Sequence, residues 1–332
     1  MAYIKIDRSA LLHNLDLITQ RAGGKGRVVA VLKDNAYGHG LELMAKMLQE
    51  YGITKAVVRT RAEAKRIASF FSDIIILADT PVTDCFSYAI NDLEQLRNAP
   101  QGAKIELKVD SGMHRNGILA EELEEAFRFI KKRNVELTGV FTHFRSADEL
   151  SGELFWQVEN WQEIKEKVRK FCEEYGIQHP RFHSANSATL FRYGVIDDFA
   201  RVGIAMYGYL EMDAIFDQPP LRPVLSLWAK RIASRRLAEG ERVGYGGVFV
   251  ANEPMEVSTY DVGYADGIFR ALRSCAAGEI LGRVSMDSLS LAGCADAVCI
   301  IDDAKEMAHH LGTISYEVLV KLSPQIPRVV TE

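Results

Sequence analysis

Short apolar segments alternate with longer amphipathic segments through the first two thirds of the chain. The apolar segments predict strands at 27–33, 55–58, 74–78, 86–90, 104–109, 138–143, 180–183 and 199–206. Amphipathic segments of helical length separate many of them, most clearly at 119–132 and 152–175. Eight strands with intervening helices over about two hundred residues are typical of a (β/α)8 barrel of the TIM type.

The pattern changes after about residue 221. A run of short β-like segments begins at 221–230 and continues to residue 303, with Gly, Asp and Asn turns between the segments. One further helix is expected near 303–311. The sequence therefore predicts an α/β protein with a barrel over residues 1–221 and a C-terminal, mainly β domain over residues 222–332. A length of 332 residues suits two domains.

Composition narrows the classes of partner. The chain has 45 acidic and 40 basic residues, and no basic stripe with interleaved aromatic residues, so we expect no nucleic-acid partner. The five cysteines show no metal-ligand spacing and are expected to be reduced thiols, with no metal site. The N-terminus lacks an apolar signal core, and no apolar run reaches the length of a membrane span. We therefore expect a cytoplasmic protein with no membrane partner.

Lys33 stands at the end of the first predicted barrel strand and directly before a glycine-containing loop. Burial beside apolar walls lowers the pKa of a lysine, and a neutral amine can form a Schiff base with an aldehyde such as pyridoxal phosphate (PLP). The alternative is a strand-end lysine whose ammonium group reaches solvent.

Other polar residues also follow predicted strands, and the C-terminal ends of barrel strands are where barrel chemistry gathers. Ser187 follows the seventh strand, and Gly203 and Ile204 lie at the eighth, which are the places where barrels often bind phosphate. His143 ends the sixth strand, and Arg201 lies at the eighth. Taken singly, each has a structural alternative. His143 could be a hydrogen-bonded core histidine, and Arg201 could pair with a nearby aspartate. Structural packing is likewise the alternative for three residues of the second domain: Tyr245, Tyr264 and Met286.

Taken together and in order, these segments resemble the alanine racemase family, whose members are PLP-dependent enzymes of fold-type III. The similarity rests on motifs spread over both domains: residues 6–15, 32–40 (LKDNAYGHG), 108–117 (KVDSGMHRNG), 142–144, 186–187, 201–204, 244–246, 263–267, 282–287 and 316–317. The resemblance implies an isomerase that interconverts L- and D-alanine by a two-base mechanism and supplies D-alanine for peptidoglycan. It also implies a homodimer in which the subunits share active sites.

The resemblance also implies a role for each matching residue. Lys33 would bind PLP covalently and act as one catalytic base, and Tyr245 of the partner subunit would be the other. Cofactor contacts would come from Tyr37, His143, Asn186, Ser187, Arg201, Gly203, Ile204 and Tyr316. His143 would lie against the pyridine ring and Arg201 would bond its nitrogen. The substrate would meet Arg115, Tyr264 and Met286. Lys108 resembles a lysine that is carbamylated and holds Arg115.

Several positions depart from the family pattern. Asp34 stands where a small residue is usual, Ser285 replaces a frequent cysteine, and residues 325–328 (QIPR) lack one arginine of the usual terminal motif. Tyr316 and Ile314 predict a small substrate pocket, which favours alanine. A serine or broad-specificity racemase is the nearest alternative, because an apolar pocket discriminates one added group by only ~1–3 kcal/mol. A non-catalytic PLP-binding barrel, a decarboxylase and an aldolase are more distant alternatives.

Overall fold

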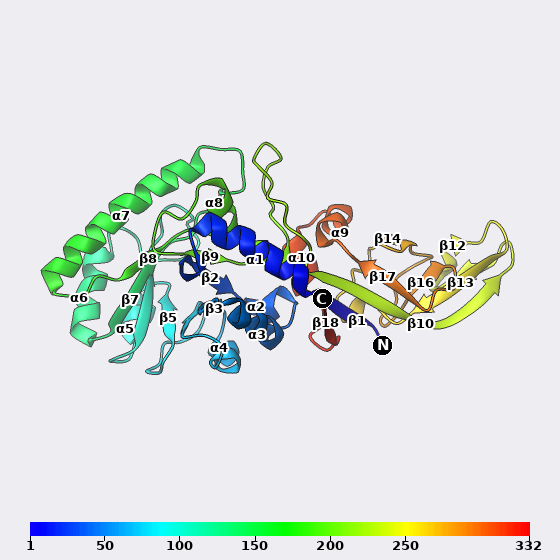
Figure 1. The fold of residues 1–332 in the computed structure, drawn as a ribbon, viewed down its shortest axis with the longest axis horizontal. Helices are drawn as coiled ribbons and strands as arrows, with labels where there is room; N and C mark the ends of the chain where they lie inside the picture. The colour runs from blue at the N-terminus through cyan, green and yellow to red at the C-terminus, as the bar shows by residue number, and fades with distance from the viewer.

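Eight parallel strands form the sheet of the first part of the computed structural model, which describes residues 1–332 (Figure 1). Their order is β8-β7-β6-β5-β4-β3-β2-β9. The strands are β2 (Val28–Val31), β3 (Lys55–Val58), β4 (Asp73–Ile76), β5 (Ser87–Ile90), β6 (Lys104–Lys108), β7 (Glu136–Phe141), β8 (Arg181–His183) and β9 (Ala200–Val202). The two outer strands meet: Asp198 N donates to Phe182 O at 3.0 Å, and Arg201 N donates to Ala185 O at 2.9 Å. The predicted (β/α)8 barrel is therefore confirmed.

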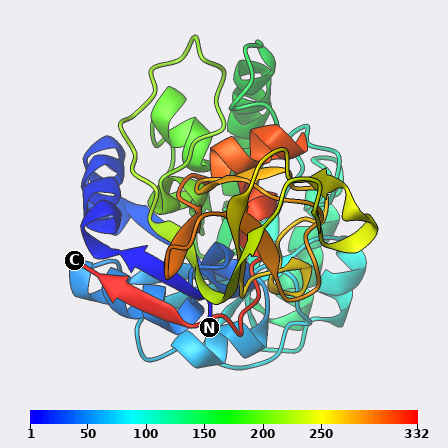
Figure 2. The ribbon, with the colours of Figure 1, turned by 90° about the vertical axis from the view of Figure 1, so that its right-hand side faces the viewer.

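The helices cover the outside of this barrel (Figures 1 and 2). They are α1 (Arg8–Ala22), α3 (Leu41–Tyr51), α4 (Arg61–Ile67), α5 (Leu93–Asn98), α6 (Leu123–Arg133), α7 (Glu153–Tyr175) and α8 (Ser187–Arg192). Several of these helices begin after a residue whose side chain caps the helix N-terminus. In α4, Thr60 and Glu63 form a reciprocal capping box, which satisfies amides that the first helical turn leaves unpaired. The helices predicted at 119–132 and 152–175 correspond to α6 and α7.

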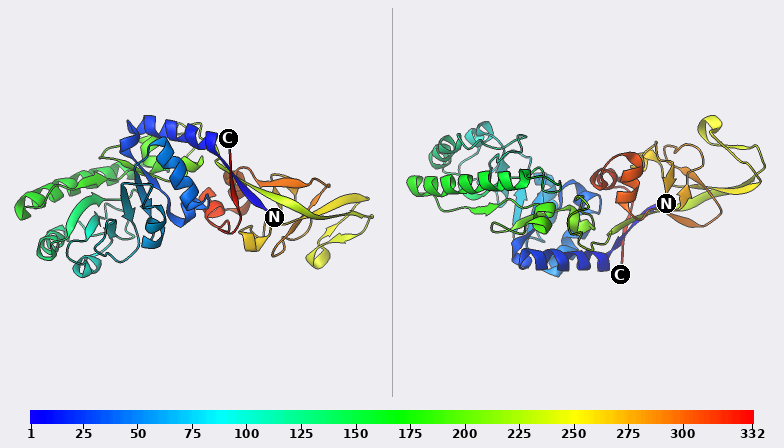
Figure 3. Two further views of the ribbon diagram at one scale, coloured as in Figure 1. Left: turned by 60° about the horizontal axis from the view of Figure 1, so that its bottom comes forward. Right: turned by 90° about the horizontal axis from the view of Figure 1, so that it is seen from above.

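A second, mainly β part extends away from the barrel, as both views of Figure 3 show. Its main sheet has the order β16-β13-β10-β1-β18, and β17 also pairs with β10. These strands are β1 (Tyr3–Asp7), β10 (Leu225–Leu237), β13 (Met255–Tyr260), β16 (Leu289–Ala292), β17 (Ala297–Ile301) and β18 (Arg328–Thr331). Two small hairpins join β11 (Arg242–Val243) to β12 (Phe249–Val250) and β14 (Ser274–Cys275) to β15 (Gly278–Glu279). The mainly β character of this part confirms the predicted fold class.

The structure corrects three details of the prediction. Residues 3–7 form β1, which pairs with β10 and β18, so the chain begins in the sheet of the second part. The strand predicted at 199–206 ends at Val202, and a 3-10 turn follows at Ile204–Tyr207. The single helix predicted near 303–311 is α9 (Ala304–Leu311), and a second helix, α10 (Ser315–Val320), follows it. The domain boundary between residues 221 and 222 stays a prediction.

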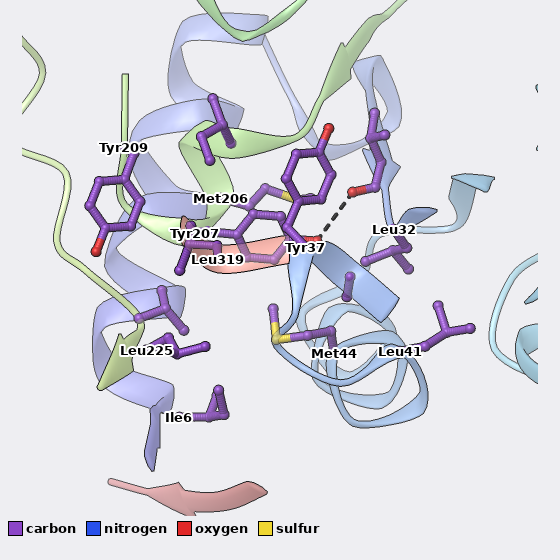
Figure 4. Packing of buried hydrophobic residues seen from close by; sticks show 14 of the residues in the cluster. Ile6, Leu32, Tyr37, Leu41, Met44, Met206, Tyr207, Tyr209, Leu225 and Leu319 are labelled. Carbon is purple, nitrogen blue, oxygen red and sulfur yellow. Dashed lines mark hydrogen bonds between the residues drawn. The ribbon is translucent and has the colours of Figure 1, made fainter. Parts of the chain in front are cut away.

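One hydrophobic core joins the two parts. A cluster of 63 buried residues contains Ile6 of β1, Leu225 of β10, Tyr207 and Leu319, which Figure 4 shows packed together. The Tyr207 hydroxyl donates to the Val31 carbonyl at 3.1 Å, which satisfies the buried phenol (Figure 4). This packing holds α10 against the loop that follows β2. None of the helices combines the length and the apolar character that crossing a lipid bilayer requires.

Candidate active site

A cavity of about 650 Å³ opens at the C-terminal ends of the barrel strands. This is the end of a barrel at which loops bring together side chains from distant parts of the chain. Eleven of the fourteen predicted site residues line it: Lys33, Tyr37, Lys108, Arg115, His143, Asn186, Ser187, Arg201, Gly203, Ile204 and Tyr316. The structure therefore brings together the residues that were singled out in the first domain, and one from the second.

Lys33 lies two residues beyond the end of β2, and its half-buried side chain faces the cavity. Its ammonium group makes no hydrogen bond or ion pair with the chain, so it is available to a ligand. The residues that follow, Asp34 to Tyr37, all have φ between 52° and 57°. Four consecutive non-glycine residues in the left-handed region are costly, and such strain is found where a functional side chain must be held in place.

Hydrogen-bond donors gather on one side of the cavity. Ser187 Oγ accepts from Gly203 N at 3.2 Å, which leaves its own hydroxyl hydrogen to donate elsewhere. The hydroxyls of Tyr37 and Tyr316 make no hydrogen bond within the chain, and their rings are 5.9 Å apart. Burial raises the pKa of both phenols, so both remain protonated donors. A Cβ at Gly203 would come within 2.7 Å of the Tyr37 hydroxyl, so the glycine keeps this space open.

The Arg201 guanidinium donates its hydrogen bonds to neutral acceptors rather than to an aspartate. Its Nη1 lies 2.7 Å from His183 Nδ1 and donates to His183 O at 2.8 Å, and its Nη2 donates to Thr142 O at 2.7 Å. The pairing partners considered from the sequence were Asp197 and Asp198. Asp197 instead accepts from Lys165 at 2.8 Å, and Asp198 accepts from Phe182 N at 2.6 Å. Burial lowers the pKa of Arg201 to about 10, so the guanidinium remains charged near neutral pH. The ion-pair alternative for Arg201 is therefore wrong.

His143 is half-buried in the cavity wall and makes no hydrogen bond within the chain. Burial, followed by the nearby Arg201 charge, lowers its pKa to about 3, so the imidazole is neutral at physiological pH. A neutral ring without partners is suited to contact a flat ligand through its face. This placement does not fit the alternative of a hydrogen-bonded core histidine.

Lys108 and Arg115 also line the cavity. The Lys108 ammonium donates a hydrogen bond to Asn116 Oδ1 rather than approaching a carboxylate. Burial, and then the charge of Arg115, lowers the pKa of Lys108 to about 8. Arg115 is exposed and has no ion-pair partner in the chain. Two cations therefore stand close together here, and a negative group between them would be stabilised.

Tyr245, Tyr264 and Met286 do not reach the cavity. They lie on the second part, and their exposed fractions are 65%, 40% and 54%. The loops that carry Tyr264 and Met286 are adjacent, because Tyr264 N donates to Ser285 O at 3.0 Å. The loop that carries Tyr245 lies against Arg283, which belongs to the same loop as Met286. Three exposed, mainly apolar side chains thus lie on neighbouring loops of the second part and do not line the cavity of their own chain.

Comparison with known proteins decides the family. A model of the alanine racemase N-terminal domain matches residues 6–211, and a model of the C-terminal domain matches residues 224–330. The chain belongs to the alanine racemase family. An alanine racemase from a Nitratiruptor species is 58% identical over 328 residues, which covers 99% of each chain. An alanine racemase from Campylobacter concisus is 46% identical over 337 residues, again covering 99% of each.

Solved structures of alanine racemases have the same fold as this chain. The crystal structure of alanine racemase from Bacillus anthracis with bound L-Ala-P is 28% identical, with a TM-score of 0.89. The match covers 100% of this chain and 95% of that one. Alanine racemases are PLP-dependent isomerases. The cavity fits this cofactor, because an unpaired lysine, a cluster of hydroxyl and amide donors and a buried arginine face one space.

Two features of the site escaped the sequence reasoning. Glu106 lies fully buried beneath the cavity, where it contacts His183 at 2.9 Å. Its signal was a carboxylate between two apolar residues of a predicted strand, Ile105-Glu106-Leu107, since a buried charge needs a partner. Further polar residues of the cavity wall come from loops outside the recognised motifs: Asn91, Arg145, Asp148 and Glu211. No strand or motif pattern identifies such residues.

Proposed function

We propose that this chain interconverts L- and D-alanine with PLP, using Lys33 and Tyr245 of the partner subunit as the two bases. The observation that carries the proposal is the separation of these residues. Lys33 faces the cavity without a partner, whereas Tyr245 is 65% exposed on the second part of the same chain. We infer that a second copy brings its Tyr245 to this Lys33, because the Tyr245 of the same chain does not line the cavity. The proposal therefore includes a homodimer with shared active sites.

Most of the groups proposed to bind the PLP phosphate donate no hydrogen bond within the chain; the Gly203 amide, which donates to Ser187 Oγ, is the exception. The phosphate would meet the hydroxyls of Ser187, Tyr37 and Tyr316 and the amides of Gly203 and Ile204. Asn186, next to Ser187 at the start of α8, would support this side of the site. Lys33 Nζ would bind the aldehyde carbon, His143 would lie against the ring, and Arg201 would bond the ring nitrogen.

When bound, PLP withdraws electrons from the Cα–H bond of an attached amino acid, so that this proton becomes acidic. Lys33 Nζ, freed when the amino group of the substrate takes its place on the aldehyde carbon, would remove or return the proton on the side of the D-enantiomer. The hydroxyl of the partner's Tyr245 would do the same on the side of the L-enantiomer. A neutral phenol is a weak base, so the Tyr245 hydroxyl needs a nearby positive charge that favours its anion, and Arg115 would supply one. Tyr264 and Met286 of the partner would enclose the substrate.

Arg201 would restrict the reaction to proton exchange. A guanidinium donates hydrogen bonds and does not accept a proton, so the ring nitrogen would stay unprotonated. Electron withdrawal is then weaker than with a carboxylate partner, which favours return of the proton over side reactions such as transamination. The buried Arg201 is suited to this part because acceptors on both of its Nη groups fix the orientation of the guanidinium.

Lys108 is proposed to be carbamylated. Its lowered pKa, about 8, increases the share of neutral amine that can react with carbon dioxide, releasing one proton as the carbamate forms. The product is an anion beside Arg115, in place of a second cation. This would hold Arg115 toward Tyr245 of the partner subunit.

The substrate is proposed to be alanine, because Ile314 and Tyr316 narrow the pocket. Serine, or a broader range of amino acids, remains the alternative, since a hydroxyl adds little volume. The five free cysteines fit a reducing cytoplasm, where D-alanine for peptidoglycan would be made. A PLP-binding protein without catalysis would have no use for Tyr245 on a second domain.

Optical rotation tests the proposal. Purified protein is incubated with L-alanine and with L-serine in separate reactions, and the loss of rotation is followed. We expect rapid loss with L-alanine and slower loss with L-serine. Tyr245→Phe should lose racemisation while keeping PLP, whereas a cofactor-binding protein would show no racemisation even in the wild type. Equal rates with both amino acids would replace alanine specificity by broad specificity.

A further inference from the structure

A line of polar side chains runs through the barrel interior beneath Arg201. Glu106 of β6 and His183 of β8 are fully buried, and Arg201 of β9 is 7% exposed. Glu106 Oε2 lies 2.9 Å from His183 Nε2, and His183 Nδ1 lies 2.7 Å from Arg201 Nη1. The carboxylate, the imidazole and the guanidinium therefore form one continuous chain of hydrogen bonds that ends at the cavity.

We propose that Glu106 is a positioning residue, which fixes the tautomer of His183 and thereby holds Arg201 toward the cofactor. This inference rests on the proposed function, in which Arg201 bonds the ring nitrogen of PLP. Glu106 itself touches neither the cavity nor a substrate, and it acts only through His183.

Donor and acceptor chemistry allows a single tautomer at His183. A guanidinium only donates, so His183 Nδ1 must present a lone pair to Arg201. The ring hydrogen is then on Nε2, where the Glu106 carboxylate accepts it. Burial, and then the opposing Arg201 charge, lowers the pKa of His183 to about 4, which keeps the ring neutral. Among the other groups around the ring, Arg181 carries a charge, and the stacked rings of Phe141 and Phe199 do not.

Glu106 is fixed on its other side as well. Its Oε1 accepts from Arg181 Nε at 3.0 Å. The Thr138 hydroxyl, whose shortest hydrogen bond is to the Ile105 carbonyl at 2.8 Å, lies 3.1 Å from the same Oε1. Arg181 also pairs with Asp73, so opposite charges alternate along the barrel interior. Gly139 lies opposite Glu106 in the β6–β7 register, and a Cβ there would collide with Glu106 Oε2. The absence of a side chain at Gly139 therefore leaves the space that the Glu106 carboxylate occupies.

The same hydrogen bonds leave one donor of Arg201 for a ligand. The four Nη hydrogens are directed to His183 Nδ1, His183 O, Thr142 O and, at 3.4 Å, Ser184 O. The Nε hydrogen has no partner in the chain. The position of His183 thus decides how the guanidinium is turned and which hydrogen meets the ligand.

The isosteric change Glu106→Gln tests the inference sharply. Arg181 only donates, so the Gln oxygen must face Arg181 and the Gln NH2 group must face His183 Nε2. We expect His183 to move its hydrogen to Nδ1, where it opposes the Arg201 donor and displaces the guanidinium. The affinity for PLP should fall about tenfold to a hundredfold, as expected for a lost charge-assisted hydrogen bond, and the absorption spectrum of bound PLP should change. Thr138→Val is the matched control, because it removes a hydroxyl that lies 3.1 Å from Glu106 Oε1 and leaves the His183 contact.

The tautomer is read by long-range ¹H–¹⁵N correlation spectra of histidine-labelled protein without PLP. The wild type and Thr138→Val should show hydrogen on Nε2 alone at neutral pH, and Glu106→Gln should show it on Nδ1. A wild-type His183 that is protonated or carries its hydrogen on Nδ1 overturns the inference, even if no variant folds. An unchanged tautomer and PLP affinity in Glu106→Gln overturns it too. Unchanged PLP affinity in Arg201→Leu, with the expected wild-type tautomer, would instead contradict only the proposed role of Arg201.

Discussion

The carboxylate of Glu63 accepts a hydrogen bond of 2.8 Å from the backbone amide of Asp34, the residue directly after Lys33. The same carboxylate accepts from Arg59 N at 2.9 Å and from Thr60 N at 3.2 Å. It therefore connects the cap of α4 to the left-handed turn that holds the candidate catalytic lysine. Because that turn is costly in itself, such external contacts are what maintain it.

Replacing Glu63 should loosen this turn. We expect Glu63→Ala to lower the free energy of unfolding by about 1–3 kcal/mol, through unpaired amides, and to weaken PLP binding. Thr60→Ala is the control, because it removes the other half of the capping box at a cost of about 1 kcal/mol and keeps the contact with Asp34. Urea unfolding and a PLP titration measure both effects. Equal loss of PLP affinity in the two variants would contradict a role for Glu63 at Lys33.

Gly203 should be required for the cofactor rather than for the fold. A Cβ at this position would approach the end of the Tyr37 side chain at 2.7 Å, in the space proposed for the phosphate. We expect Gly203→Ala to weaken PLP binding at least about tenfold, since a charge-assisted contact is lost. Gly152→Ala is the control, because nothing lies within 4 Å of its Cβ. Tight PLP binding by Gly203→Ala would place the phosphate elsewhere.

His39 should make the fold sensitive to acid. Burial lowers its pKa from 6.5 to about 3. At a pH between these two values, His39 therefore binds a proton in the unfolded chain and does not bind one in the folded chain. The stability linked to His39 is therefore fully present above pH 6.5 and decreases as pH falls toward 3, by up to about 1.36 kcal/mol per pH unit. Urea unfolding between about pH 7 and pH 5, which spans the ordinary histidine pKa, measures the slope. His39→Phe should reduce it, and the exposed control His309→Gln should not; equal slopes in all three proteins would refute the assignment.

The barrel could be predicted because its strands are short, apolar and separated by clear helical segments. Even the short strands at residues 55–58 and 87–90 were recognised, since all or most of their residues are buried and apolar. The strand β1 was missed because its partners, β10 and β18, lie more than 200 residues away. Local pattern does not reveal a pairing at such separation.

The residues of the candidate site could be located only because their motifs are short and contiguous. Their neighbours in space were harder to find. Glu106 lies 77 positions from His183 in the sequence, and nothing in the local pattern joins them. The left-handed turn after Lys33 was also missed, because Asp34, Asn35 and Ala36 have no glycine among them to signal a positive φ. Tertiary contacts, rather than local preference, hold that conformation.

The most direct test of the shared active site pairs two inactive variants. Lys33→Ala and Tyr245→Phe are co-expressed with different tags, and the mixed dimer is purified through both tags. If Tyr245 acts across subunits, one site of each mixed dimer combines an intact Lys33 with an intact Tyr245 from the partner. Such a dimer should racemise L-alanine at about half the wild-type rate, whereas each variant alone is inactive. A mixed dimer as inactive as the two variants would contradict the account, because each intact base would then serve only its own chain.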